Sequence, residues 1–127
     1  RGYRQKLEYL LDTYQSARKF AKSISKEESA QKKFASFFGD LDETVDILCK
    51  RTAPGGYHCW TIGNRKIFRK TVPMHSLLCE MLEARNLKPV ATIGRRIAKK
   101  KMAIRNNISS TMGYESIVVA RASRKNE

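Results

Sequence analysis

Apolar residues recur at helical spacing in three stretches of the chain. The first stretch runs from Tyr3 to about Ala17 and the second from about Gln31 to Lys50, and both carry polar side chains on the opposite face. Gly39 lies inside the second pattern and allows a break or a second helix start there, because glycine within a helix costs about 1 kcal/mol relative to alanine. A third helix is predicted to begin at Pro73, which suits a first helical turn, and to end near Asn86.

The residues between the first two helices predict a connection. From Arg18 to Lys33 the chain is rich in Ser, Lys and Glu, and Phe20 and Ile24 are the exceptions among its polar residues. We expect a frayed helix end followed by an exposed segment, the most mobile part of the chain.

Three β-prone runs follow the first two helices. They are Tyr57–Ile62, which comes after a Pro-Gly-Gly turn, Val90–Ile97 and Glu115–Ala122. Neither face of the first run carries charge, so we expect a strand that is buried on both faces. The helix between the first two runs is long enough for a crossover, which predicts that these two strands are parallel neighbours. The segment Ala98–Met112 is predicted to be a long loop.

These elements predict one α/β domain that is incomplete. Its expected parts are a helical region over 1–52, a strand–helix–strand–loop–strand unit over 53–122 and a tail over 123–127. Two or three strands and three helices cannot cover both faces of a doubly wound sheet, so we expect a sizeable uncovered apolar patch. Because the chain begins with Arg1 instead of Met, we also expect it to be a piece of a longer protein.

The charge of the chain is large and unevenly spread. The formal net charge is +14, and the stretch from Arg65 to Arg105 holds twelve Lys and Arg residues against two acids, Glu80 and Glu83. Positive charge concentrated in this way favours a polyanionic partner, because each phosphate that a cation neutralises releases counterions. The alternative is a solvated surface that keeps the protein soluble, but such a surface normally mixes both signs of charge.

The candidate binding segment is the loop from Gly63 to Lys66. In an open α/β sheet, ligands bind beyond the carboxyl ends of the strands, and this loop follows the first predicted strand. Gly63 and Asn64 tolerate tight backbone geometry, and the cluster of cations begins at Arg65.

Other site chemistry is not indicated. Cys49, Cys59 and Cys79 are an odd number without C-x-x-C spacing, which favours buried thiols over disulfides or zinc. His58 and His75 have no second ligand at a recognisable spacing, so we expect no metal. No apolar run approaches the roughly 18 residues that a membrane span needs, and we expect a soluble, intracellular protein.

Several blocks of the sequence resemble the carboxyl-terminal part of the catalytic domain of prokaryotic amino-methylating DNA methyltransferases. In chain order the blocks are Arg51–Tyr57, Thr61–Arg65, Arg95–Met102 and Met112–Val119. The first two are similar to the family's helix-to-strand turn and to the strand end with its loop, the third to a basic segment and the fourth to the closing strand. The resemblance extends over roughly residues 34–121. Ala98 and Ala103 stand where the family often has prolines.

The resemblance implies a partial Rossmann-like class I methyltransferase fold, with a mostly parallel sheet and an antiparallel last strand. It implies transfer of a methyl group from S-adenosylmethionine to an exocyclic amino group of adenine or cytosine in duplex DNA. The expected partners are duplex DNA and the missing remainder of the catalytic domain, in the same parent chain or in a second subunit. The expected location is the cytoplasm of a prokaryote.

Two motifs of that family are absent from the chain. Its only prolines are Pro54, Pro73 and Pro89, so it has no Asp/Ser/Asn-Pro-Pro-Tyr/Trp motif to hold the target amino group. It also has no Phe-x-Gly-x-Gly turn for the cofactor, since Phe38-Gly39-Asp40 lacks the second glycine and lies in a helical pattern. We therefore assign no catalytic residue within the 127 positions and expect the chain to be inactive alone.

The roles that remain are a pocket wall and contacts to the DNA backbone. Gly63 and Asn64 are expected to form one wall of the target-base pocket. The backbone contacts are assigned to eight cations, which are Arg65, Lys66, Arg69, Lys70, Lys99, Lys100, Lys101 and Arg105.

Two alternative functions remain open. One is a non-catalytic basic nucleic-acid-binding α/β module, and the other is a partner subunit that completes a split enzyme. Against a base-stacking module, we expect Tyr57 and Trp60 to be buried, and no exposed aromatic pair is interleaved with the cations.

Overall fold

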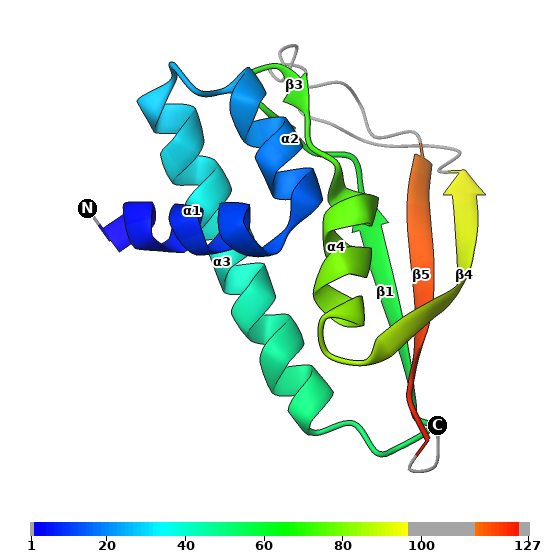
Figure 1. Cartoon of the computed structure of the whole chain (residues 1–127). Helices are drawn as coiled ribbons and strands as arrows, with labels where there is room; N and C mark the ends of the chain where they lie inside the picture. Colours follow the sequence, from blue (N-terminus) through cyan, green and yellow to red (C-terminus); the bar gives the residue numbers. More distant parts are fainter. Residues whose placement is uncertain (1, 97–113, 125–127) are drawn as a thin grey trace.

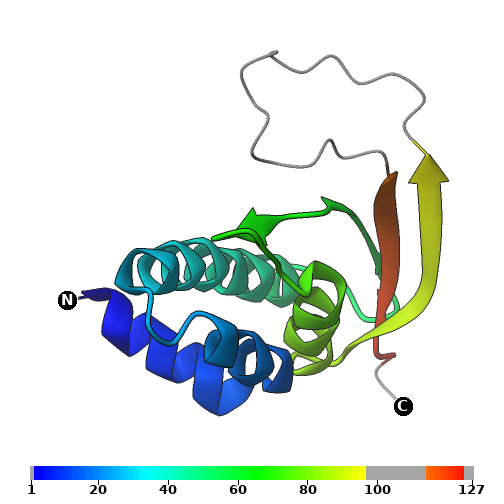
Figure 2. The same cartoon turned by 90° about the horizontal axis from the view of Figure 1, so that it is seen from above.

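A computed structural model describes residues 2–96 and 114–124, and it places four helices on one face of a small sheet (Figure 1). The helices are α1 (Gly2–Thr13), α2 (Gln15–Ser23), α3 (Glu28–Lys50) and α4 (Met74–Glu83). The strands are β1 (Tyr57–Gly63), β2 (Lys66–Ile67), β3 (Lys70–Thr71), β4 (Leu87–Arg96) and β5 (Tyr114–Ala122). Viewed from above, the helices and the sheet form two layers (Figure 2). None of the described helices is long and apolar enough to cross a lipid bilayer.

The amino-terminal region differs from its prediction. The expected helix from Tyr3 to Ala17 is broken at Tyr14, where the backbone is extended, and α2 begins at the next residue. The segment after Ala17 is not an exposed connection, because Ala17, Phe20 and Ile24 are at most 6% exposed and pack in the core. Their helical spacing was visible in the sequence, but the surrounding Ser, Lys and Glu residues obscured it.

The second predicted helix is confirmed as α3, which begins three residues earlier than expected and continues through Gly39. A Cβ atom at Gly39 would lie 3.1 Å from the Cδ atom of Lys6 on α1. The glycine therefore marks a close approach of two helices, and the helix does not break there. The helix predicted after Pro73 is confirmed as α4, and Asn86 adopts a positive φ of 62° just beyond it.

The predicted parallel sheet is wrong. The strand order is β1-β5-β4, and β5 pairs antiparallel with both neighbours, so the sheet contains no parallel pair. The strands β1 and β4 run in the same direction, as a crossover helix requires, but β5 lies between them. The crossover helix predicts that β1 and β4 run in the same direction, and the family resemblance implies the antiparallel last strand. The sequence carries no signal for the position of that strand in the sheet.

The first strand is confirmed at Tyr57–Gly63, but it is not buried on both faces. His58 and Trp60 face the helices and are half-buried, whereas Tyr57 is 64% exposed and Cys59 is exposed. The described helices cover one face only, which leaves Ile93 on the other face 53% exposed as well. The uncovered apolar surface agrees with the expectation from the sequence, and the exposed Cys59 corrects the prediction of three buried thiols.

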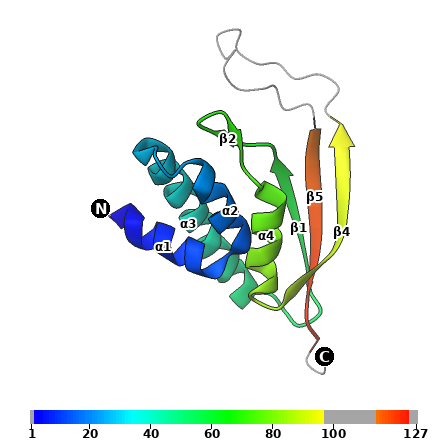
Figure 3. The same ribbon diagram turned by 45° about the horizontal axis from the view of Figure 1, so that its top comes forward.

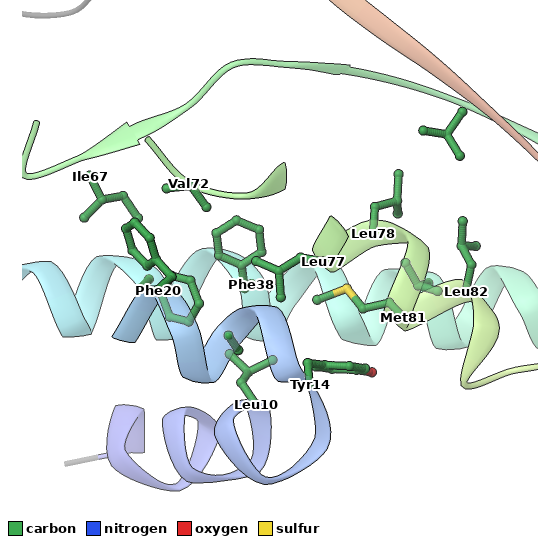
Figure 4. Packing of buried hydrophobic residues seen from close by; sticks show 14 of the residues in the cluster. Leu10, Tyr14, Phe20, Phe38, Ile67, Val72, Leu77, Leu78, Met81 and Leu82 are labelled. Atoms are coloured by element: carbon green, nitrogen blue, oxygen red, sulfur yellow. The ribbon is translucent and has the colours of Figure 1, made fainter. Parts of the chain in front are cut away.

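The core lies between the helices and the inner face of the sheet (Figure 4). The side chains of Ile67 and Val72 point from β2 and from the segment after β3 toward the aromatic side chains of the helices, including Phe20 and Phe38. A polar network lies at the carboxyl end of α4. Arg85 donates to Asp42 (3.1 Å), to Asp46 (3.1 Å) and to the carbonyl oxygen of Met81 (3.0 Å).

Candidate nucleic-acid interface

The carboxyl end of β1, the β2–β3 hairpin and the amino end of α4 gather at one end of the molecule (Figure 3). This end holds a pocket of about 190 Å³. Its lining residues are Ile62, Gly63, Asn64, Val72, Pro73, Met74, His75, Ser76 and Ser116. The structure therefore places both residues assigned to the pocket wall, Gly63 and Asn64, at a real concave surface where the first strand ends.

The polar groups of this pocket come from three separate elements. Asn64 follows β1, His75 and Ser76 lie in the first turn of α4, and Ser116 lies on β5. The His75 Nε2 atom is 2.9 Å from the hydroxyl oxygen of Thr92 on β4, which positions the imidazole ring. None of the described lining residues is acidic, and their hydrogen-bonding side chains lie beside apolar ones.

The basic segment after Asn64 is a hairpin, not the loop that the sequence predicts. Lys66 pairs with Thr71 and Ile67 with Lys70, and the Val72 N–H donates to the Arg65 carbonyl oxygen at 2.8 Å. Ile67 and Val72 are each 3% exposed, so the base of the hairpin is anchored in the core.

Four of the assigned cations are brought together on this hairpin. Arg65, Lys66, Arg69 and Lys70 are all exposed, and no ion pair within the described residues involves them. The guanidinium carbon of Arg65 lies 4.3 Å from the centre of the Phe37 ring, which fixes this side chain by a cation–π contact. The other four assigned cations, which are Lys99, Lys100, Lys101 and Arg105, lie outside the described residues.

Two other arginines in the basic part of the chain are compensated. Arg85 is paired with Asp42 and Asp46, and Arg95 is paired with Glu115. Burial opposes the charge of Arg85, but hydrogen bonds to Asp42, Asp46 and Tyr14 outweigh it and raise the Arg85 pKa above its ordinary value. Arg85 and Arg95 are thus engaged within the fold, whereas the hairpin brings four exposed cations without an ion pair among the described residues close together.

His58 belongs to a structural hydrogen-bond chain. Trp60 Nε1 donates to His58 Nδ1 (3.2 Å), His58 Nε2 lies 2.6 Å from the Thr52 hydroxyl, and that hydroxyl donates to the Leu48 carbonyl oxygen (2.6 Å). Since Nδ1 accepts, the ring proton is on Nε2 and the imidazole is neutral. Burial lowers the His58 pKa in agreement with this. Within the described parts of the chain, no three His, Cys, Asp or Glu side chains lie close enough together to hold a metal ion.

Sequence reasoning missed two exposed aromatic residues. Phe68 is 55% exposed at the tip of the hairpin between Lys66 and Arg69, and Tyr57, which we expected to be buried, is 64% exposed. The signal for Phe68 was present, because it is the one aromatic side chain within the run of cations from Arg65 to Lys70. The exposure of Tyr57 follows from the uncovered face of the sheet, which the sequence of that strand does not reveal.

The described chain has an α/β fold, in which a layer of helices covers an antiparallel sheet with the last strand at its centre. A basic hairpin beside a pocket forms its candidate polyanion site. No protein-family model matches the sequence, and no curated protein matches it in sequence.

Two solved structures of one protein from Thermus thermophilus, named provisionally as a DNA modification methylase, resemble the fold. The selenomethionine derivative gives a TM-score of 0.55 at 16% identity, over 72% of this chain and 38% of that one. The complex with S-adenosyl-L-methionine gives a TM-score of 0.52 at 17% identity, over 71% of this chain and 38% of that one. At this identity the likeness concerns the fold, and this chain spans less than half the length of its neighbour.

Proposed function

We propose that this chain is part of an S-adenosylmethionine-dependent DNA methyltransferase that modifies an exocyclic amino group of adenine or cytosine. The observation that carries the proposal is the hairpin of four exposed cations beside the Gly63–Asn64 pocket, in a fold similar to part of a DNA modification methylase. In this proposal the chain contributes one wall of the target-base pocket and holds the DNA backbone beside it.

The physical role of the hairpin follows from the energetics of base flipping. Rotating a base out of the duplex costs a few kcal/mol, and contacts to the flanking phosphates hold the distorted duplex during that time. Lys66, Arg69 and Lys70 are free to make such contacts because no acidic residue in the described structure pairs with them. In this proposal Asn64 and Ser76, which line the pocket, provide hydrogen-bonding groups to the base.

The pocket beside the hairpin is too small to hold S-adenosylmethionine. The pocket of about 190 Å³ is smaller than the roughly 300 Å³ or more that ligands of that size occupy. The chain also has no Phe-x-Gly-x-Gly turn. We therefore assign the cofactor, and the Asp/Ser-Pro-Pro-Tyr-type motif, to the missing remainder of the catalytic domain, which would also cover the open face of the sheet.

The contribution of the hairpin is tested by measuring duplex DNA affinity at several salt concentrations. The variant Lys66→Gln/Lys70→Gln should bind less tightly, and the slope of log affinity against log salt should fall by about two. The control is Arg51→Gln/Lys88→Gln, which removes equal charge at the opposite end of the sheet, where α3 ends and β4 begins (Figure 1). Equal effects of the two variants would contradict a specific role for the hairpin.

The methyltransferase assignment is tested on the gene that encodes these residues. We expect the parent gene, or that of a partner, to encode an Asp/Ser-Pro-Pro-Tyr-type motif, and we expect its product to transfer labelled methyl groups to duplex DNA. A parent without the motif and without such a partner would overturn the assignment. The absence of both motifs from these residues would then favour the second candidate, a non-catalytic nucleic-acid-binding module.

A further inference from the structure

The tip of the β2–β3 hairpin has an unusual backbone for the residues that occupy it. Phe68 and Arg69 both have positive φ angles, 51° and 64°, as the central residues of a two-residue turn. Turns of this kind strongly favour Asn-Gly, because glycine and asparagine tolerate the left-handed conformation and bulky residues do not. A strained backbone of this kind is a reason to ask what the Phe68 side chain does there.

The base of the hairpin holds the tip in place. Ile67 and Val72 are buried in the core on the two sides of the turn, and Arg65 is fixed against Phe37. Figure 4 shows Ile67 and Val72 directed into the helical layer. Phe68 is 55% exposed and takes part in none of the ring–ring contacts within the described residues.

We propose that Phe68 is a nucleobase-stacking residue, which stacks on an unpaired or unstacked base while Lys66, Arg69 and Lys70 hold the adjoining phosphates. Aromatic side chains within a positively charged surface are the usual means of holding an exposed base, and apolar wedges are inserted between base steps by proteins that kink duplex DNA. The hairpin follows Asn64 directly, so its tip and the pocket lie at the same end of the molecule.

A membrane surface is the other partner that an apolar tip among cations could suit. Interfacial binding requires a broad apolar face, however, and the hairpin exposes one large apolar side chain. The charge and the single ring therefore favour nucleic acid. This inference rests on the proposed function in that it requires binding to DNA, but it does not require methyl transfer.

The test compares two labelled duplexes, one fully paired and one with a single mismatched 2-aminopurine. We expect the wild-type chain to bind the mismatched duplex more tightly and to quench its 2-aminopurine fluorescence by stacking. Phe68→Ala should lose about fivefold or more of the affinity for the mismatched duplex and also lose the quenching, with an unchanged salt slope. Phe68→Trp should retain both, and Tyr57→Ala, which removes an equally exposed aromatic ring from the sheet, should behave as wild type.

The outcomes separate the two proposals. If the wild-type chain binds DNA with the expected salt dependence but Phe68→Ala retains the quenching and the affinity, the stacking role is overturned and the proposed function stands. If the wild-type chain binds neither duplex in a salt-dependent way, the DNA-binding role fails and the stacking role fails with it. Circular dichroism and thermal unfolding of Phe68→Ala establish that the variant is folded.

Discussion

The carboxylate of Glu80 on α4 accepts a hydrogen bond of 2.7 Å from the backbone N–H of Gln15, the first residue of α2. Its second oxygen accepts from the N–H of Ser16 at 3.1 Å. No side chain of α2 itself provides such a cap, because the preceding residue is Tyr14. Glu80 thus accepts hydrogen bonds from the free N–H groups at the amino end of a helix that is distant in sequence.

Replacing Glu80 by Gln should lower the free energy of unfolding by about 1 kcal/mol, since a charged acceptor at a helix amino terminus becomes neutral. Urea denaturation followed by circular dichroism measures the change. The matched control is Glu83→Gln, which removes an exposed acid from the same helix. Equal stability losses in the two variants would show that the capping contact has no special role.

Arg85 compensates the carboxylate of Asp42, whose residue is 6% exposed. The variant Arg85→Met should lose about 3 kcal/mol or more of stability, because it leaves a buried charge without its partner. Adding Asp42→Asn should restore part of the loss, since the buried group is then neutral. Arg96→Met, at an exposed arginine, should change stability little. A double variant that is less stable than Arg85→Met would contradict this account.

Burial lowers the His58 pKa below its ordinary value of 6.5. The unfolded chain therefore takes up a proton on this side chain at a higher pH than the folded chain does. The stability that neutral His58 contributes is present above pH 6.5 and is lost as the pH falls through the folded-state pKa. Protonation also removes the acceptor for the Trp60 N–H.

We accordingly expect the free energy of unfolding to fall as the pH drops below 6.5 toward the folded-state pKa, and to fall less in His58→Gln. His75→Gln is the control, because this exposed histidine lies outside that hydrogen-bond chain. The prediction fails if the His58→Gln variant keeps the full pH dependence of the wild type.

Arg69→Gly should separate stability from binding. Glycine relieves the strain at a φ of 64° but adds backbone freedom to the unfolded chain, so we expect a net stabilisation of up to about 1 kcal/mol. Affinity for duplex DNA should fall, with a salt slope smaller by about one. Lys70→Gly removes the same charge from a strand position without positive φ, and thermal unfolding should show it to be destabilised. A stabilised Lys70→Gly variant would contradict this explanation.

Much of the secondary structure could be predicted from the sequence. The apolar spacing of α3 and α4 and the runs of β1 and β5 define these elements to within a few residues. The helix α2 was missed because Lys and Ser dominate its exposed face. The sheet order could not be predicted, because the position of β5 between β1 and β4 depends on pairing between segments that are distant in sequence.

Two residues of the predicted site line a pocket, although the sheet is antiparallel and not the parallel sheet that the prediction assumed. The rule that ligands bind beyond the carboxyl end of a strand led to Gly63 and Asn64, which line a pocket. The hairpin was not predicted, since Phe68 and Arg69 are poor residues for a tight turn, and the burial of Ile67 and Val72 determines its geometry instead. The turn propensity of single residues does not predict a backbone conformation that is determined by the packing of neighbouring side chains in the core.

The central position of β5 also determines the order in which this chain can complete its fold during synthesis. Residues 114–122 provide the only described pairing partners of β1 and β4, whereas α1 to α4 and much of the core are translated before them. The helices can pack while the ribosome is still elongating, but β1 and β4 remain two unpaired edges until the last strand emerges. A nascent chain halted before Tyr114 thus exposes the strands that most readily pair with other chains, which makes this interval the one in which a chaperone would matter.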